Sequence, residues 1–141
     1  LIGSLNCVYQ DTWVEYAQKM AETGIDALEL NFYASEIDFE TDGAHLVMEQ
    51  IETLKRVKAS IRIPLLVKLS PFYTNPLSVI LKMDQAGASG FVLFNRLFQP
   101  DIDIDKEIHH YPYNFSSEND NRLALRYAGL LYSRIDGTIV A

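Results

Sequence analysis

The chain has 141 residues, 48% of them hydrophobic, and a formal net charge of -7 at pH 7. This length and composition suffice for one domain with a buried core, while the acidic balance disfavours nucleic acid and anionic membranes as main partners. The single cysteine, Cys7, excludes an internal disulfide and favours a reducing, cytoplasmic location. We find no apolar run long enough to span a bilayer.

Short apolar runs alternate with amphipathic stretches along the chain. We predict strands at residues 1–7, 27–32, 63–69, 90–94 and 137–141, and helices at about 12–23, 44–59, 76–87 and 121–133. A capping box of Thr12 and Glu15 indicates the start of the first helix, and Asn75 followed by Pro76 indicates that of the third. Residues 99–119 are rich in Asp, Tyr, His and Ser. They are predicted to form a long loop, which acts as a lid or an oligomer contact or packs its own aromatic residues at the surface.

This order of strands and helices predicts an α/β fold with a parallel sheet. Two architectures fit it. One is a segment of a (β/α)8 TIM barrel, which needs about 250 residues when complete. The other is a complete, doubly wound sheet of the flavodoxin type. The length favours the second, but the chain begins and stops within strands. We therefore expect residues 1–141 to be a single barrel segment that is truncated at both ends.

Polar residues stand where the apolar runs end. Asn31, Lys68 and Asn95 each follow or close a predicted strand, and Asn6 does so after the first. The carboxyl ends of parallel strands are where ligands bind in α/β proteins. A single Asn or Lys at such a place is as often a loop cap or a solvated charge. Three at equivalent positions favour a binding site.

Four motifs in register carry a family resemblance: LIGSLNC at 1–7, DALELN at 26–31, PLLVKLSP at 64–71 and GFVLFN at 90–95. Together they resemble the FMN-binding barrel of dihydroorotate dehydrogenases and the related domain of dihydropyrimidine dehydrogenases. The resemblance covers nearly the whole chain and corresponds to barrel strands three to seven. It implies an FMN-dependent oxidoreductase of pyrimidine biosynthesis, which transfers hydride from a dihydropyrimidine-like substrate to flavin N5.

The resemblance also assigns roles to the residues at the strand ends. Asn31 and Asn95 would contact both the pyrimidine and the flavin. Lys68 would place a positive charge near the N1 and O2 edge of the flavin, where the reduced ring gathers negative charge. Asn6 is a weaker candidate for the floor of the same site. The flavin-facing residues of the family are therefore present.

The substrate-facing positions depart from the family. Its catalytic base, a Cys or Ser, stands at the position of Ala34, which cannot accept a proton; the adjacent Ser35 is a weak substitute because a serine needs activation. Glu36 replaces a substrate-binding Asn and would repel the carboxylate of orotate unless it were protonated or paired. Arg96 replaces a small hydroxyl residue, and it binds an anionic group or pairs with Glu36. We expect a changed substrate site.

Three functions fit these observations: an FMN-dependent oxidoreductase with a base other than Cys, a catalytically silent flavin- or phosphate-binding barrel of the same descent, or a flavodoxin-like or receiver-like signalling module. A receiver domain requires a phosphoacceptor Asp where this chain has Lys68. This difference disfavours the signalling module. The family's phosphate-binding loops would follow Ala141, so we expect the fragment to be inactive and to bind FMN weakly or not at all by itself.

Two further expectations concern partners and metals. A partial barrel exposes two sheet edges, which predicts self-association into a homo-oligomer. The acidic stretch with Asp38, Glu40 and Asp42 nearly matches a calcium loop, but it has Glu in place of Asp or Asn at the third position of the loop. It is predicted to be a solvated loop, and no metal is expected.

Overall fold

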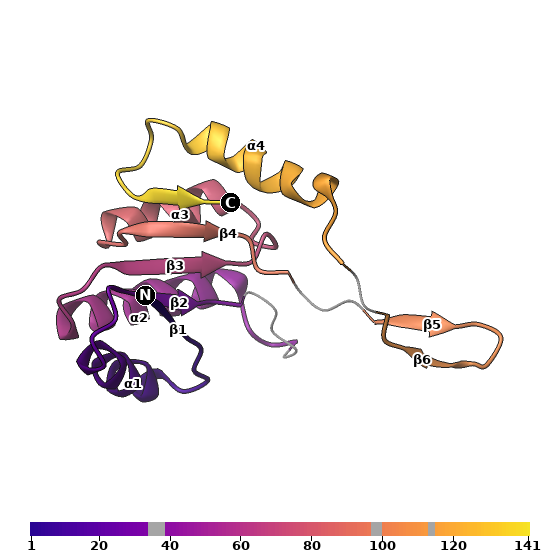
Figure 1. The fold of residues 1–141 in the computed structure, drawn as a ribbon, viewed down its shortest axis with the longest axis horizontal. Coiled ribbons are helices and arrows are strands. Elements are labelled where there is room, and N and C mark those ends of the chain that lie inside the picture. Colours follow the sequence, from indigo (N-terminus) through magenta and orange to yellow (C-terminus); the bar gives the residue numbers. More distant parts are fainter. Residues whose placement is uncertain (34–38, 97–99, 113–114) are drawn as a thin grey trace.

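The structure is a computed structural model that describes residues 1–33, 39–96, 100–112 and 115–141. Its main sheet has five parallel strands that are adjacent in chain order (Figure 1). They are β1 (Ile2–Leu5), β2 (Ala27–Asn31), β3 (Leu65–Leu69), β4 (Gly90–Leu93) and β7 (Thr138–Val140). The predicted α/β class with a parallel sheet is confirmed, and each predicted strand is present with slightly shorter bounds.

Four α-helices connect these strands: α1 (Gln10–Glu22), α2 (Gly43–Ser60), α3 (Pro76–Gln85) and α4 (Arg122–Leu131). Each helix contacts the next along the chain. Right-handed crossovers between sequential parallel strands place all connecting helices on one face of the sheet. The helices therefore form one layer against that face; α2 and α3 lie behind the strands in Figure 1.

The helix-covered face of the sheet is the hydrophobic core. Side chains alternate across the sheet, and the alternate positions of β2 and β3 are buried while the positions between them are partly exposed. The register keeps these faces continuous, because Leu30 lies opposite Val67 and Val67 opposite Phe91. All three side chains are fully buried. Among the described residues, no helix covers the opposite face.

The strand order decides between the two architectures that the sequence leaves open. A flavodoxin-type sheet has the order 2-1-3-4-5, with helices on both faces. The observed order is β1-β2-β3-β4-β7, which is that of a sheet wound in one direction only. The flavodoxin-like alternative is therefore wrong for this sheet.

Two of the predicted helix boundaries are confirmed by their caps. The Asn75 side chain accepts a hydrogen bond from the Ser78 amide at 3.1 Å, with Pro76 in the first turn. Gly87, at the end of the same helix, has a φ of +100°, which glycine adopts without strain.

The capping box predicted at Thr12 and Glu15 is wrong. Helix α1 begins at Gln10, after Tyr9, so that Thr12 lies inside the first turn. Its hydroxyl donates to the Tyr9 carbonyl oxygen at 2.6 Å, while Glu15 pairs with Lys19 one turn further on. The hydroxyl bonds back to the preceding turn, which serine and threonine do within helices.

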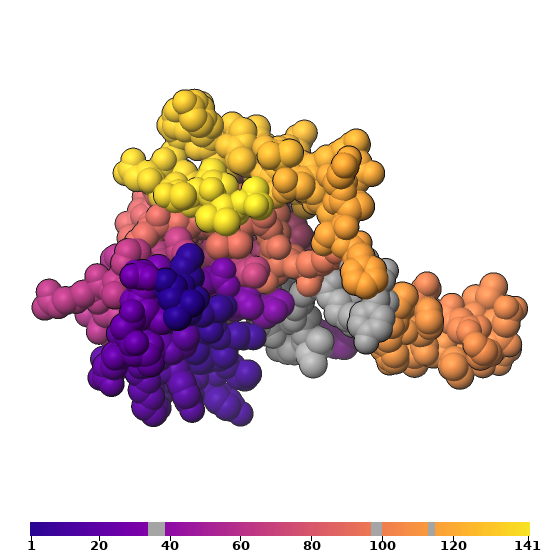
Figure 2. Space-filling model, viewed as in Figure 1, coloured from indigo at the N-terminus to yellow at the C-terminus, as the bar shows by residue number. Residues whose placement is uncertain are grey.

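The segment predicted as a loop at 99–119 contains regular structure. Strands β5 (Asp101–Asp103) and β6 (Ile108–His110) pair as an antiparallel hairpin, and a 3-10 helix, η1 (Glu118–Asn121), precedes α4. The hairpin projects away from the main sheet (Figure 2). Its apolar side chains Ile102, Ile104 and Ile108 are exposed. Whether it is a lid or an oligomer contact stays a prediction.

Within the described ranges, no helix has both the length and the apolar character that crossing a membrane requires.

A substitution at Gly90 tests how closely β4 packs against β7. A Cβ added there would lie 2.7 Å from the Thr138 carbonyl oxygen and 2.8 Å from Leu66 Cδ2. We expect Gly90→Ala to lower the free energy of unfolding by about 1–3 kcal/mol, because a backbone oxygen cannot move aside cheaply. Urea unfolding of the whole protein measures this.

Gly129 supplies the matched control, because it lies inside α4 and an added Cβ would meet no atom within 4 Å apart from the neighbouring residues and backbone of its own helix. Gly129→Ala should raise the free energy of unfolding by about 0.5–1 kcal/mol through helix propensity. Equal effects of the two substitutions would contradict the close approach of the two strands at Gly90.

Candidate functional site

Asn31 and Lys68 lie side by side at the carboxyl ends of β2 and β3. They are directly opposite in the parallel register, and residues opposite each other share a face of the sheet. This is the face that the helices leave uncovered. The two residues that sequence reasoning placed in one site are thus brought together.

A polar row lies one step below them on the same face. Glu29 Oε1 lies 3.9 Å from Lys68 Nζ and accepts a hydrogen bond from the Ser4 hydroxyl at 2.7 Å. The Glu29 side chain is only 12% exposed and that of Lys68 is 32% exposed, so that solvent screens the pair incompletely. The Glu29 carboxylate therefore balances part of the charge of Lys68.

Glu29 and Ser4 are site residues that the sequence analysis missed. Each stands two positions before a residue that it did single out, Asn31 and Asn6. In a strand, residues two apart share a face. A charged residue within an otherwise apolar parallel strand, at that spacing from Asn31, is the signal that could have identified Glu29.

The amide oxygen of Asn31 is the one buried side-chain polar atom without a hydrogen-bond partner among the described residues. Its amide nitrogen donates to the Tyr33 hydroxyl at 3.4 Å. Buried polar atoms in folded proteins are nearly always paired, and an orphan calls for an explanation such as a ligand. The arrangement suits a ligand with an N–H group beside β2.

Asn95 has a structural task that the sequence did not reveal. It lies two residues beyond β4 and is 6% exposed. Its Nδ2 donates to the Phe32 carbonyl oxygen at 3.0 Å, and its backbone amide donates to the Leu69 carbonyl oxygen at 2.7 Å. Asn95 thus ties the end of β4 to the chain just beyond Asn31, and its amide nitrogen is already engaged.

Asn6 follows β1 and lines a cavity of about 320 Å³ together with Asn31, Cys7 and Tyr33. The structure therefore places Asn6 with Asn31, as the sequence suggested. No group of three or more His, Cys, Asp or Glu side chains within the described ranges is arranged to hold a metal ion.

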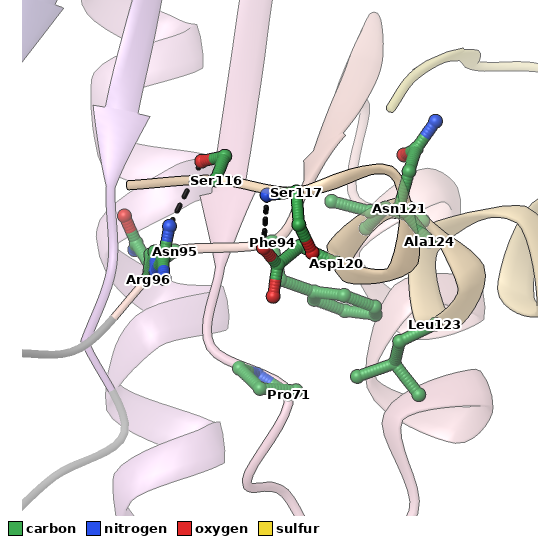
Figure 3. A pocket seen from close by; sticks show the side chains of 11 residues that line it. Pro71, Phe94, Asn95, Arg96, Ser116, Ser117, Asp120, Asn121, Leu123 and Ala124 are labelled. Carbon is green, nitrogen blue, oxygen red and sulfur yellow. Dashed lines mark hydrogen bonds between the residues drawn. The ribbon is translucent and has the colours of Figure 1, made fainter. Parts of the chain in front are cut away.

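Arg96 faces a second cavity, of about 360 Å³, between the end of β4 and η1 (Figure 3). Its Nη1 donates to the Ser116 hydroxyl at 2.8 Å. Asp120 lines the same cavity and accepts from the Ser117 amide at 2.6 Å. That hydrogen bond lowers the pKa of Asp120, and the nearby Arg96 guanidinium lowers it further. Arg96 shares this cavity with Asn95.

The three positions on which the chemistry of the family depends, Ala34, Ser35 and Glu36, lie outside the described residues. The assignment of a base position to Ala34, the substitute role of Ser35 and the pairing of Glu36 with Arg96 therefore stay predictions.

The chain is similar to known dihydroorotate dehydrogenases, although no family model matches it. Dihydroorotate dehydrogenase A (fumarate) of Lactobacillus helveticus is 30% identical over 107 residues, which are 74% of this chain and 34% of that protein. The enzyme of the same name from Limosilactobacillus reuteri is 31% identical over 110 residues, 74% of this chain and 35% of that protein.

A second type of enzyme is also similar. The catalytic subunit of dihydroorotate dehydrogenase B (NAD(+)) from Thermoplasma volcanium is 28% identical over 107 residues, 74% of this chain and 34% of that protein. The chain thus spans about a third of the length of the curated relatives it matches. Over 74% of its own length the chain is similar to dihydroorotate dehydrogenases, which confirms the predicted resemblance to that family.

Proposed function

We propose that the chain is part of an FMN-dependent oxidoreductase of the dihydroorotate dehydrogenase type, which acts on a reduced pyrimidine or a related heterocycle. The observation that carries this proposal is the buried, unpartnered amide oxygen of Asn31, the residue that lies opposite Lys68 in the register of the sheet. The similarity to dihydroorotate dehydrogenases supports it.

The barrel architecture is part of the proposal. When helices cover one face of a parallel sheet, the other face carries both apolar and polar side chains. That face must also be covered in the folded protein. Strands in sequential order cover that face when further strands close the sheet into a barrel. We propose that β1 to β7 are such a segment, with Glu29, Asn31 and Lys68 pointing inward.

The residues present fit a flavin. The Asn31 amide oxygen could accept a hydrogen bond from a ring N–H group, which the flavin and a pyrimidine both offer. The Lys68 ammonium group would stabilise negative charge on an adjacent aromatic ring, and the Glu29 carboxylate lies 3.9 Å from it. When bound, FMN would supply the hydride acceptor.

The silent barrel remains the second candidate, and Ala34 is the observation that favours it. An alanine at the family's base position leaves the substrate proton without an acceptor at that place.

The pyrimidine-like substrate is part of this proposal. The cytoplasmic location and the homo-oligomer stay predictions.

The charge of Lys68 can be tested through the flavin midpoint potential of the whole protein. We expect Lys68→Gln to lower that potential by roughly 30–60 mV, about 1.4–2.8 kcal/mol for a two-electron couple, because reduced flavin loses a neighbouring positive charge. Glu29→Gln should shift the potential the other way, because it removes the carboxylate that offsets Lys68. Spectroelectrochemical titration measures both.

Lys82 is the matched control, since it is an exposed lysine in α3. Lys82→Gln should leave the midpoint potential unchanged. If the midpoint potential responds equally to both lysine substitutions, or to neither, Lys68 does not lie next to the flavin.

Substitutions at Ala34 test whether this residue occupies the position of the catalytic base. We expect Ala34→Cys to raise the rate of flavin reduction by dihydroorotate about 100-fold, the lower range of what a positioned base contributes. Anaerobic stopped-flow absorbance measures this rate. Ala34→Val, which adds no proton acceptor, is the control. A rate that does not change in Ala34→Cys would mean that proton removal does not depend on this position.

A further inference from the structure

A buried polar pair connects α2 to the chain just beyond β2. The Tyr73 hydroxyl donates to Gln50 Oε1 at 2.6 Å, and Gln50 Nε2 donates to the Tyr33 carbonyl oxygen at 3.0 Å. Tyr73 is 9% exposed and Gln50 is 7% exposed. Three separate segments, namely α2, the loop after β3 and the end of β2, thus meet at one side-chain amide.

This pair lies in a core that is otherwise mainly apolar. A buried amide or hydroxyl destabilises a protein unless its polar atoms find partners. Two apolar side chains of similar volume would fill the same space without that requirement. The hydrogen bonds form only when all three segments are in their places. The pair therefore restricts the relative positions of these segments more than apolar packing would. Burial also raises the pKa of Tyr73, which keeps its hydroxyl protonated as a donor.

The position that the pair specifies is the start of the segment with the family's chemistry. Tyr33 is followed directly by Ala34, at the expected base position. On the other side of Tyr33, the Phe32 carbonyl oxygen is held by Asn95, and the Phe32 amide donates to the Lys68 carbonyl oxygen at 2.9 Å. The chain is therefore held at two consecutive carbonyl groups where it leaves β2.

We propose that Gln50 and Tyr73 are positioning residues for Tyr33 and, through Tyr33, for Asn31 in the site. They fix the Tyr33 carbonyl group, and the Tyr33 hydroxyl accepts a hydrogen bond from Asn31 Nδ2. Neither residue is proposed to contact the substrate. The role toward the substrate rests on the proposed function, whereas the fixing of Tyr33 does not.

Two substitutions remove the hydrogen bonds with little change in volume. Tyr73→Phe deletes only the hydroxyl, and Gln50→Met keeps the length of the side chain without its amide. Ser89→Ala is the matched control: Ser89 Oγ accepts a part-buried hydrogen bond from the Leu65 amide at 3.2 Å, at the opposite ends of the strands. The three variants can be compared in the whole protein, with global stability measured for each.

Amide hydrogen exchange provides the first test, because it needs neither flavin nor substrate. In the peptide that contains Phe32 and Tyr33, we expect exchange to quicken about 10-fold in Tyr73→Phe and Gln50→Met, because the segment opens more often once the support of the Tyr33 carbonyl group is weakened. Ser89→Ala should leave this peptide unchanged. Unchanged exchange in the first two variants, or the same increase in all three, would overturn the proposal.

Kinetics provides the second test and separates positioning from packing. With the pyrimidine that reduces the flavin, kcat/KM should fall about 10-fold in Tyr73→Phe, as expected for the loss of one hydrogen bond. The flavin midpoint potential should stay that of the wild type, because Lys68 is untouched. Faster exchange with unaltered kcat/KM would overturn the role toward the substrate. A colourless protein that takes up no FMN would overturn the proposed function, while the exchange result would still decide whether the pair fixes Tyr33.

Discussion

The parallel register of the five strands is the constraint on which the rest of the structure depends. Because β2 and β3 pair without offset between their alternating side chains, Leu30 and Val67 fall on the helix-covered face, while Asn31 and Lys68 fall together on the other. A register slip of one residue would bury the lysine and expose the leucine. The apolar core thus determines where the charged side chains stand, and one arrangement serves both stability and the site.

The carboxyl ends of the strands are held by side chains as well as by the ladder. Asn95 reaches from the end of β4 to the carbonyl group after β2, and Gln50 reaches the next carbonyl group from α2. Loops that carry function need a rigid support beneath them. In this chain the support is polar, and it is built from residues that a family comparison would count only as core or as ligand contacts.

Local sequence signals predicted helix boundaries correctly where only one local structure fits the signal. Asn75 before Pro76 predicted a helix start that the structure confirms, because a side-chain cap and a fixed φ act within a few residues. Thr12 and Glu15 gave the same kind of signal and misled, since Thr12 bonds back to Tyr9 from inside the first turn.

The same limit applies to the site. Asn31 and Lys68 were predictable because each ends an apolar run, whereas the pairing of Glu29 with Lys68 and of Gln50 with Tyr73 depends on register and helix packing. No local pattern encodes contacts between residues so far apart in the chain. The hairpin of β5 and β6 was missed because a short strand of Asp, Ile and His looks like a polar loop.

We propose that the uncovered face of this sheet forms part of a flavin site for a reduced pyrimidine. The most direct measurement is the visible absorbance of the whole protein, followed by anaerobic titration with dihydroorotate and dihydrouracil. We expect a yellow protein whose absorbance is bleached by one of the two compounds. A colourless protein that takes up no added FMN would contradict it.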